Sequence, residues 1–153
     1  MNYEQESRRL TKEAARVAPE ALAGYLARIR EELLPEGRAF AAYLRRKLRE
    51  KGILQQDVFL AADLSENYGY KLIAQEKHTR NRDVILRLCL GAKLTPEETD
   101  EALTLYGFAP LHGRLARDVV LISALAGGVQ DIHDVDALLR ENGQAPLLDG
   151  AED

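Results

Sequence analysis

The chain has no tryptophan and a single cysteine among its 153 residues. One cysteine cannot form an internal disulfide, which agrees with a protein that works in the reducing cytoplasm. Uncharged stretches do not exceed 12 residues, and one of them, 119–130, is interrupted by Gly127 and Gly128. The sequence therefore predicts no membrane-spanning segment. The first six residues are polar and acidic without an apolar core, so we expect no secretory signal either.

Side-chain patterns that support catalysis or metal binding are also missing. None of the serines lies in the Gly-x-Ser-x-Gly pattern of a nucleophile elbow. The histidines, His78, His112 and His133, are not at metal-ligand spacing from one another or from Cys89. Cys89 follows and precedes leucine, which indicates a buried, inert thiol. We therefore expect no catalytic residues, no metal site and no cofactor, and we interpret the chain as a protein that is not an enzyme.

Helical patterns, in contrast, run through the whole chain. Residues 4–17 are rich in Glu, Arg, Lys, Ala and Leu, which are strong helix formers. Pro19 suits the first turn of a second helix, in which apolar residues recur at helical spacing as far as Leu33. Further helices are expected over 40–52, from Gln55 to Ala61 or Ala62, and over 66–75 with Ser65 as N-cap. No window shows the alternation typical of strands, so the predicted fold class is all-α.

Charge is distributed unevenly along the chain. The net charge is −4, but residues 38–82 hold ten Lys/Arg against five Asp/Glu, whereas residues 83–153 carry a net charge of −8. A basic middle followed by an acidic part is typical of a nucleic-acid-binding module joined to something else. The alternative interpretation is that the basic run at 45–47 is only the solvated face of a helix.

An internal repeat occupies residues 82–111 and 117–147. The segment 82–86, Arg-Asp-Val-Ile-Leu, matches 117–121, Arg-Asp-Val-Val-Leu, and each copy ends in Ala-Pro-Leu. Each copy is expected to form a helical hairpin. Because two copies are too few for a free-standing solenoid, we expect both to pack on the preceding helices within one unit, 38–147. This leaves a helical extension over 1–37 and an acidic tail over 148–153.

The middle of the chain resembles a known DNA-binding family. Gln55 opens a short helix, Leu64-Ser65 opens the next helix, and the run Leu94-Thr95-Pro96-Glu97-Glu98 comes later. This pattern, over 38–105, resembles the phage-repressor (Cro-like, xenobiotic-response-element) type of helix-turn-helix found in bacterial transcriptional regulators. The chain departs from that family at four positions where the family often has a small residue, glycine, a β-branched residue and glycine, in this order: Phe59, Asp63, Gly69 and Gln75.

The resemblance implies a sequence-specific regulator that binds double-stranded DNA, as a homodimer on a pseudo-palindromic site. The helix that starts after Ser65 would be the recognition helix, with Tyr68 in the core beside Leu72. Candidates for contacts with base edges are the residues expected on its outer side: Ser65, Glu66, Asn67, Tyr70 and Lys71. Candidates for contacts with phosphates lie on the flanking segments: Arg45, Arg49, Gln55, Lys77, His78 and Arg80.

A second hypothesis is a non-enzymatic adaptor that uses the same helical scaffold to bind proteins and not DNA. It is supported by the acidic repeat region and by a sequence pI of about 5.5. A protein partner would then dock on the amphipathic helices of 1–37 or on the acidic repeats. Under both hypotheses we expect a cytoplasmic protein without membrane association.

Overall fold

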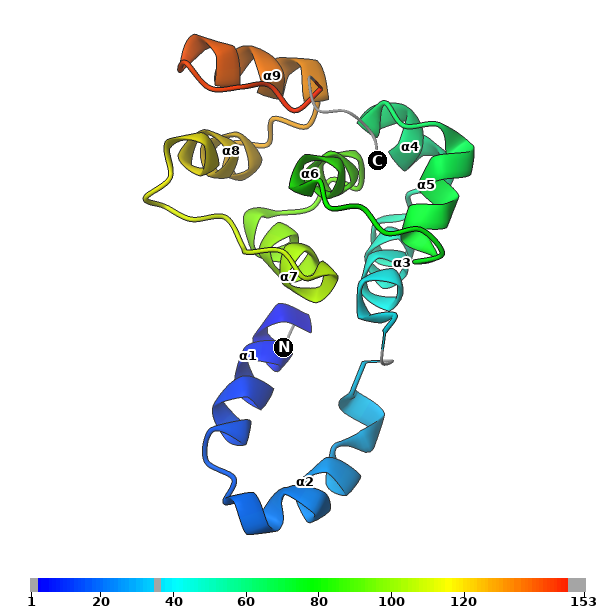
Figure 1. The fold of residues 1–153 in the computed structure, drawn as a ribbon, viewed down its shortest axis with the longest axis vertical. Helices are drawn as coiled ribbons and strands as arrows, with labels where there is room; N and C mark the ends of the chain where they lie inside the picture. Colours follow the sequence, from blue (N-terminus) through cyan, green and yellow to red (C-terminus); the bar gives the residue numbers. More distant parts are fainter. Residues whose placement is uncertain (1–2, 35–36, 149–153) are drawn as a thin grey trace. The chain divides into compact units, whose positions relative to one another are not determined.

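The computed structural model of the chain describes residues 3–34 and 37–148. Every regular element in these two ranges is a helix (Figure 1), which confirms the predicted all-α class. The chain divides into two compact units, 1–37 and 38–153. Except for Leu148, the acidic tail predicted over 148–153 lies outside the described residues.

In the first unit, the helix expected over 4–17 is α1, Tyr3–Ala14. The second helix expected there is not continuous, and this part of the prediction is wrong. It consists of a 3-10 turn, Pro19–Ala21, the seven-residue α2, Leu22–Arg28, and another 3-10 turn, Arg30–Glu32. Leu22, Leu26 and Leu33 of the predicted apolar stripe are 44%, 49% and 49% exposed. A short helix whose leucines stay exposed gains little stability from packing, which explains why it does not extend.

The second unit is built around one buried helix. Its elements are α3 (Ala39–Lys51), α4 (Gln55–Ala62), α5 (Glu66–Ile73), α6 (Arg82–Gly91), α7 (Pro96–Tyr106), α8 (Ala116–Ala126) and α9 (Ile132–Glu141). All residues of α6 from Val84 to Gly91 are buried. Figure 1 shows α6 in the middle of this unit, where it packs on α4, α7 and α9, while α3 packs on α5 and α7.

Two contacts hold α4 against α6. A Cβ atom at Gly91 would lie 2.6 Å from the carbonyl oxygen of Val58, so only glycine allows the two helices to approach this closely. The Arg87 guanidinium donates hydrogen bonds to the carbonyl oxygens of Ala62 at 2.9 Å and Asp63 at 2.7 Å. These carbonyls are at the C-terminal end of α4, where helices lack backbone partners. Arg87 therefore fixes the end of α4 and the turn that follows it.

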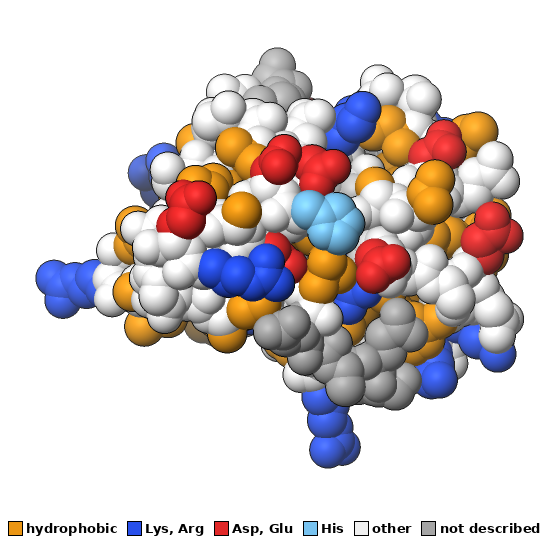
Figure 2. All heavy atoms as spheres, turned by 90° about the horizontal axis from the view of Figure 1, so that it is seen from above, with side chains coloured by type: hydrophobic (Ala, Val, Ile, Leu, Met, Phe, Trp, Pro, Cys, Tyr) orange, Lys and Arg blue, Asp and Glu red, His pale blue; other side chains and the backbone are white. Residues whose placement is uncertain are grey.

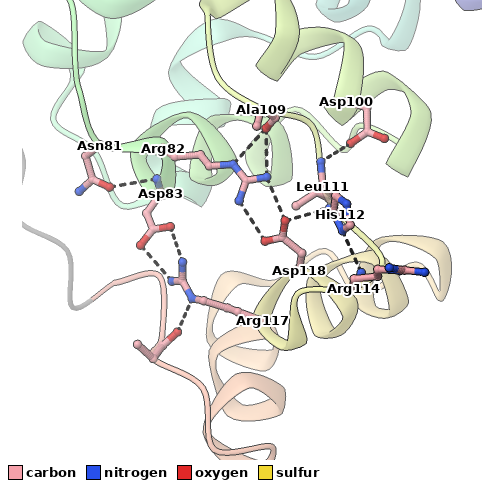
Figure 3. A network of polar contacts seen from close by, with 11 residues as sticks. Asn81, Arg82, Asp83, Asp100, Ala109, Leu111, His112, Arg114, Arg117 and Asp118 are labelled. Atoms are coloured by element: carbon pink, nitrogen blue, oxygen red, sulfur yellow. Dashed lines mark hydrogen bonds and ion pairs between the residues drawn. The ribbon is translucent and has the colours of Figure 1, made fainter.

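The two repeat copies are joined by a reciprocal pair of ion pairs (Figure 3). Arg82 of the first copy binds both carboxylate oxygens of Asp118 in the second copy, at 2.9 and 3.2 Å. Arg117 of the second copy binds both carboxylate oxygens of Asp83 in the first copy, at 2.7 and 2.9 Å. Burial is the largest single influence on the pKa of Asp118 and raises it, but the hydrogen bonds from Arg82 and from the backbone N–H of His112, together with the charges of Arg82 and Arg117, outweigh burial and hold this pKa below its ordinary value.

Further contacts recur at equivalent positions of the two copies. The Arg82 guanidinium donates to the carbonyl oxygen of Ala109 at 3.0 and 3.2 Å, as Arg117 does to that of Ala145 at 2.9 Å. An aspartate in each copy accepts the backbone N–H of its Ala-Pro-Leu leucine: the half-buried Asp100 from Leu111 and the buried Asp136 from Leu147. In addition, α6 packs on α9 and α7 packs on α8. Such exchange of equivalent contacts is typical of an approximate two-fold relation, not of the translation that relates solenoid repeats.

Candidate nucleic-acid interface

The turn between α4 and α5 is short and closed by backbone hydrogen bonds. Asp63 follows α4 with a φ of 57°, and the N–H of Leu64 donates to the carbonyl oxygen of Phe59 at 2.9 Å. Ser65 then caps α5, because its hydroxyl oxygen accepts the N–H of Tyr68 at 3.3 Å. Ser65, a candidate base-contacting residue, thus also acts as the N-cap that its sequence position predicts.

The two sides of α5 differ sharply in exposure. Tyr68, Leu72 and Ile73 are buried, with exposed fractions of 7%, 0% and 0%. The candidate base-contacting residues within the helix are all exposed and lie on its other side: Glu66, Asn67, Tyr70 and Lys71. Tyr70 is engaged in part, since its ring meets that of Phe59 edge-on with centroids 4.8 Å apart. The outer side of α5 therefore presents an amide, an ammonium group, a carboxylate and a phenol to solvent.

Two of the four departures from the repressor-like pattern compensate each other. The ring of Phe59 on α4 is fully buried and lies directly over Gly69 on α5. A Cβ atom at Gly69 would lie 2.3 Å from Cδ1 of that ring, which is far inside van der Waals contact. Phe59 in α4 and Gly69 in α5 together thus fill the volume that a small residue in the first position and a β-branched residue in the second would fill in the repressor-like pattern. The packing of α4 on α5 is kept.

The other two departures occupy left-handed backbone positions. Asp63 and Gln75 have φ angles of 57° and 58°, a conformation in which glycine avoids steric strain. Aspartate tolerates this conformation better than most residues do. Gln75 uses its side chain, because its Oε1 accepts the backbone N–H of Ala41, in the first turn of α3, at 3.1 Å. The loop after α5 is thereby tied to α3.

Three of the candidate phosphate-contacting residues line one groove between α3 and α4. This groove has a volume of about 410 Å³ and is lined by Arg45 and Arg49 of α3, Gln55 of α4 and the connecting residues 52–54. Among the described carboxylates, none forms an ion pair with Arg45 or Arg49. The groove therefore places two available guanidinium groups beside the first turn of α4.

The other three candidates, Lys77, His78 and Arg80, lie exposed in the loop between α5 and α6. Tyr106 of α7 anchors this loop: its hydroxyl oxygen accepts the buried N–H of Thr79 at 2.7 Å. The ring of His78 stacks on that of Tyr106 at 4.8 Å and 4°. Tyr106 is not among the site residues predicted from the sequence, and no local pattern marks it, because Thr79 and His78 are more than 25 residues away from it in the chain.

Lys77 is also held by an aromatic ring, since its ammonium group lies 5.2 Å from the centroid of the Tyr68 ring. A contact of this kind is worth about 0.5–1 kcal/mol at an exposed site. It restrains the Lys77 side chain beside α5 and leaves its charge available to an anion.

The basic run 45–47 is neither a single solvated face nor a single anion-binding patch. Arg46 pairs with Glu50 at 3.0 Å. Lys47 is 4% exposed, and its ammonium group lies 3.1 Å from the carboxylate of Glu98 and 3.4 Å from that of Glu50. Two of the three cations in this run, Arg46 and Lys47, thus pair with carboxylates of the same unit. The third cation, Arg45, lines the groove.

Glu98 is a junction of this internal charge network. It completes a capping box with Thr95 and also pairs with Lys51 at 2.9 Å. Burial opposes ionisation of Glu98, but the Thr95 backbone hydrogen bond and the Lys51 and Lys47 ammonium groups outweigh it and lower its pKa. Lys47 and Lys51 consequently hold α3 on α7 through Glu98.

Figure 2, which is turned by 90° from the view of Figure 1, shows Asp and Glu side chains, one His and some Lys or Arg side chains among hydrophobic ones. In the described ranges, no three His, Cys, Asp or Glu side chains come together as a metal site. No described helix is long and apolar enough to cross a bilayer.

Comparison of the chain with protein-family models, with curated proteins and with solved structures finds no match.

Proposed function

We propose that the chain is a sequence-specific DNA-binding regulator in which α4 and α5 act as a repressor-type helix-turn-helix. The observation that carries this proposal is the division of α5 into a fully packed side and an exposed polar side. A polar helix face held rigidly by a buried opposite face is suited to enter the major groove, which is wide enough to admit an α-helix.

Asn67 and Lys71 are the central base-contacting residues of the proposal. They are four residues apart on one helix, so their side chains are neighbours on the same face. An asparagine can bind adenine through two hydrogen bonds, and a lysine can donate to O6 and N7 of guanine. Glu66 can accept from the amino group of cytosine. Tyr70 is a weaker participant, since its ring is partly committed to the contact with Phe59.

Phosphate contacts are proposed on both sides of α5. Arg45, Arg49 and Gln55 surround the groove beside the first turn of α4, and Lys77 and Arg80 lie in the loop anchored by Tyr106. Contacts with phosphates fix the register of a protein on the duplex without contributing sequence information. His78 contributes least in this arrangement, because one face of its ring stacks on Tyr106.

A homodimer on a pseudo-palindromic site is part of the proposal, since repressor-type domains bind two half-sites one helical turn apart. The exposed leucines of the first unit, Leu22, Leu26 and Leu33, supply apolar surface for such contact. Light scattering after gel filtration measures the mass of the particle directly. A regulator of this kind works in the cytoplasm, where the bacterial chromosome lies, and requires no enzymatic activity or cofactor.

Selection from a pool of random duplex oligonucleotides with the purified chain tests the proposal. We expect enrichment of one motif, and a dimer should enrich two inverted copies of it. A pool that stays random, together with no duplex binding at low salt, would refute DNA binding. The alternative would then be the adaptor that binds a protein partner through 1–37 or through the acidic repeat region.

A further inference from the structure

Helix α1 carries its positive charge on one side. Arg8, Lys12 and Arg16 follow one another at four-residue intervals and are all exposed. Arg16 lies just beyond α1, but its N–H still bonds the carbonyl oxygen of Glu13 at 2.9 Å, so the helical turn reaches it. Residues four apart on a helix lie on the same face, about 5–6 Å apart at Cβ. The three cations therefore form a row, which we call the α1 basic row.

The net charge of the first unit does not reveal this row, because acidic residues elsewhere in the unit offset its three positive charges. Residues 1–37 carry a net charge of −1. The half-buried Tyr3, Ser7 and Leu10 lie on the side of α1 opposite the row, whereas the buried Glu4 lies one turn before Arg8. The neighbouring Arg9 is neutralised by Glu13 and by Glu32, whose Oε1 lies 3.5 Å from it.

Within the described residues, no carboxylate pairs with any member of the α1 basic row. A shallow groove of about 420 Å³ runs along it and is also lined by Gln5 and by the ion-paired Arg9 and Glu13. Three exposed cations without internal partners keep their full charge available to an anion. Mutual repulsion of like charges four residues apart costs stability, and an external polyanion would relieve that cost.

We propose that the α1 basic row binds the phosphate backbone of the same duplex that α5 contacts. This inference rests on the proposed function. The phosphates of a nucleic-acid strand form a row of anions. A row of cations therefore suits a strand better than it suits a single small ligand. The covalent link between the units makes the second contact intramolecular, so it adds affinity without adding base recognition. The row lacks the aromatic and leucine-rich face that a membrane-surface helix needs.

The salt dependence of DNA binding measures the number of phosphate contacts directly. We compare the double variant Arg8→Gln/Lys12→Gln with the control Arg28→Gln/Arg30→Gln, which removes the same charge from exposed residues of the same unit. Titrations of full-length protein use the selected site and a scrambled duplex at several salt concentrations. We expect the α1 variant to lower the log–log salt slope by about 2 on both duplexes. The control should leave the slope close to that of the wild type.

A charge-preserving variant, Arg8→Lys/Arg16→Lys, should keep the wild-type slope, and circular dichroism checks that all variants retain their helix content. Equal slopes for the α1 variant and the control would overturn the inference. So would an unchanged slope together with loss of binding to phosphatidylserine vesicles, which would assign the row to a membrane surface.

The two proposals fail in different ways. If the wild type binds DNA but α5 variants keep their preference for the selected site, the proposed function fails while the slope comparison still decides the role of α1. If the wild type binds no duplex at low salt, both proposals are refuted.

Discussion

Replacing Gly69 by alanine should destabilise the second unit, although the same change stabilises most helices. An added Cβ would lie 2.3 Å from Cδ1 of Phe59 and 2.6 Å from its Cγ and Cε1. The Phe59 ring is 0% exposed and is held edge-on by Tyr70 at 4.8 Å between centroids. Because the ring is rigid and enclosed, it cannot move aside without shifting α4 relative to α5.

The magnitude follows from two opposing effects. Glycine in a helix costs about 1 kcal/mol relative to alanine, so the change gains about that much from helix propensity. Insertion of a methyl group into a filled core costs about 1–3 kcal/mol. The net effect on the free energy of unfolding should therefore lie between about zero and a loss of 2 kcal/mol. In a Phe59→Leu background, where the ring is gone, the same change should recover most of that loss.

Urea unfolding followed by circular dichroism measures all four proteins of this double-mutant cycle. We expect a coupling energy between positions 59 and 69 of about 1–2 kcal/mol. An equal rise of the urea midpoint on Gly69→Ala in the wild-type and Phe59→Leu backgrounds would refute this prediction. That result would mean that α5 is not packed on the ring, and the compensation argued for these two positions would be wrong.

Three further predictions concern the repeats and the core. Arg82→Ala should lower the free energy of unfolding by about 3 kcal/mol, because it leaves Asp118, whose side chain is 4% exposed, without its cation. Arg117→Ala should lower it by only about 1–2 kcal/mol, since the side chain of its partner Asp83 is 18% exposed. The lowered pKa of Asp118 contributes stability that is complete above the unfolded value of about 3.9 and is lost as the pH falls through the lower folded value. Urea midpoints measured against pH should therefore drop more steeply in acid for the wild type than for Arg82→Ala. Burial, with a smaller effect of nearby carboxylates, raises the pKa of Cys89 to about 12, so its thiol should react with Ellman's reagent only after unfolding.

Local signals in the sequence were sufficient for much of the fold. The capping box of Thr95 and Glu98 marks the start of α7, and both of its hydrogen bonds are present, at 2.9 and 3.1 Å. The spacing of Tyr68 and Leu72 predicts which side of α5 is buried. Such features depend on residues within one or two helical turns, so a single sequence reveals them.

Features that depend on distant partners could not be predicted in this way. Lysine is usually a surface residue. Lys47 is buried because it forms an ion pair with Glu98, which lies 51 positions later in the chain. Phe59 and Gly69 each depart from the repressor-like pattern, and the compensation becomes visible only when α4 and α5 are packed together. Tyr106 anchors the basic loop through Thr79, which no local motif indicates.

The repeat illustrates the same limit. The matched Arg-Asp segments at 82–83 and 117–118 show that the two copies are equivalent. They do not indicate whether each arginine binds the aspartate of its own copy or that of the other copy. That choice depends on how the hairpins are oriented, and the reciprocal pairs resolve it in favour of exchange between copies.

The most direct test of DNA recognition by α5 is the affinity of Asn67→Ala and Lys77→Ala for the selected site and for a scrambled duplex, each at two salt concentrations. Asn67→Ala should lose about 1–3 kcal/mol of binding free energy on the selected site alone and keep the wild-type salt slope. Lys77→Ala should weaken binding to both duplexes equally and lower the slope by about 1. Equal losses for both variants on both duplexes would contradict the account, because the outer side of α5 would then attract DNA by charge without recognising its sequence.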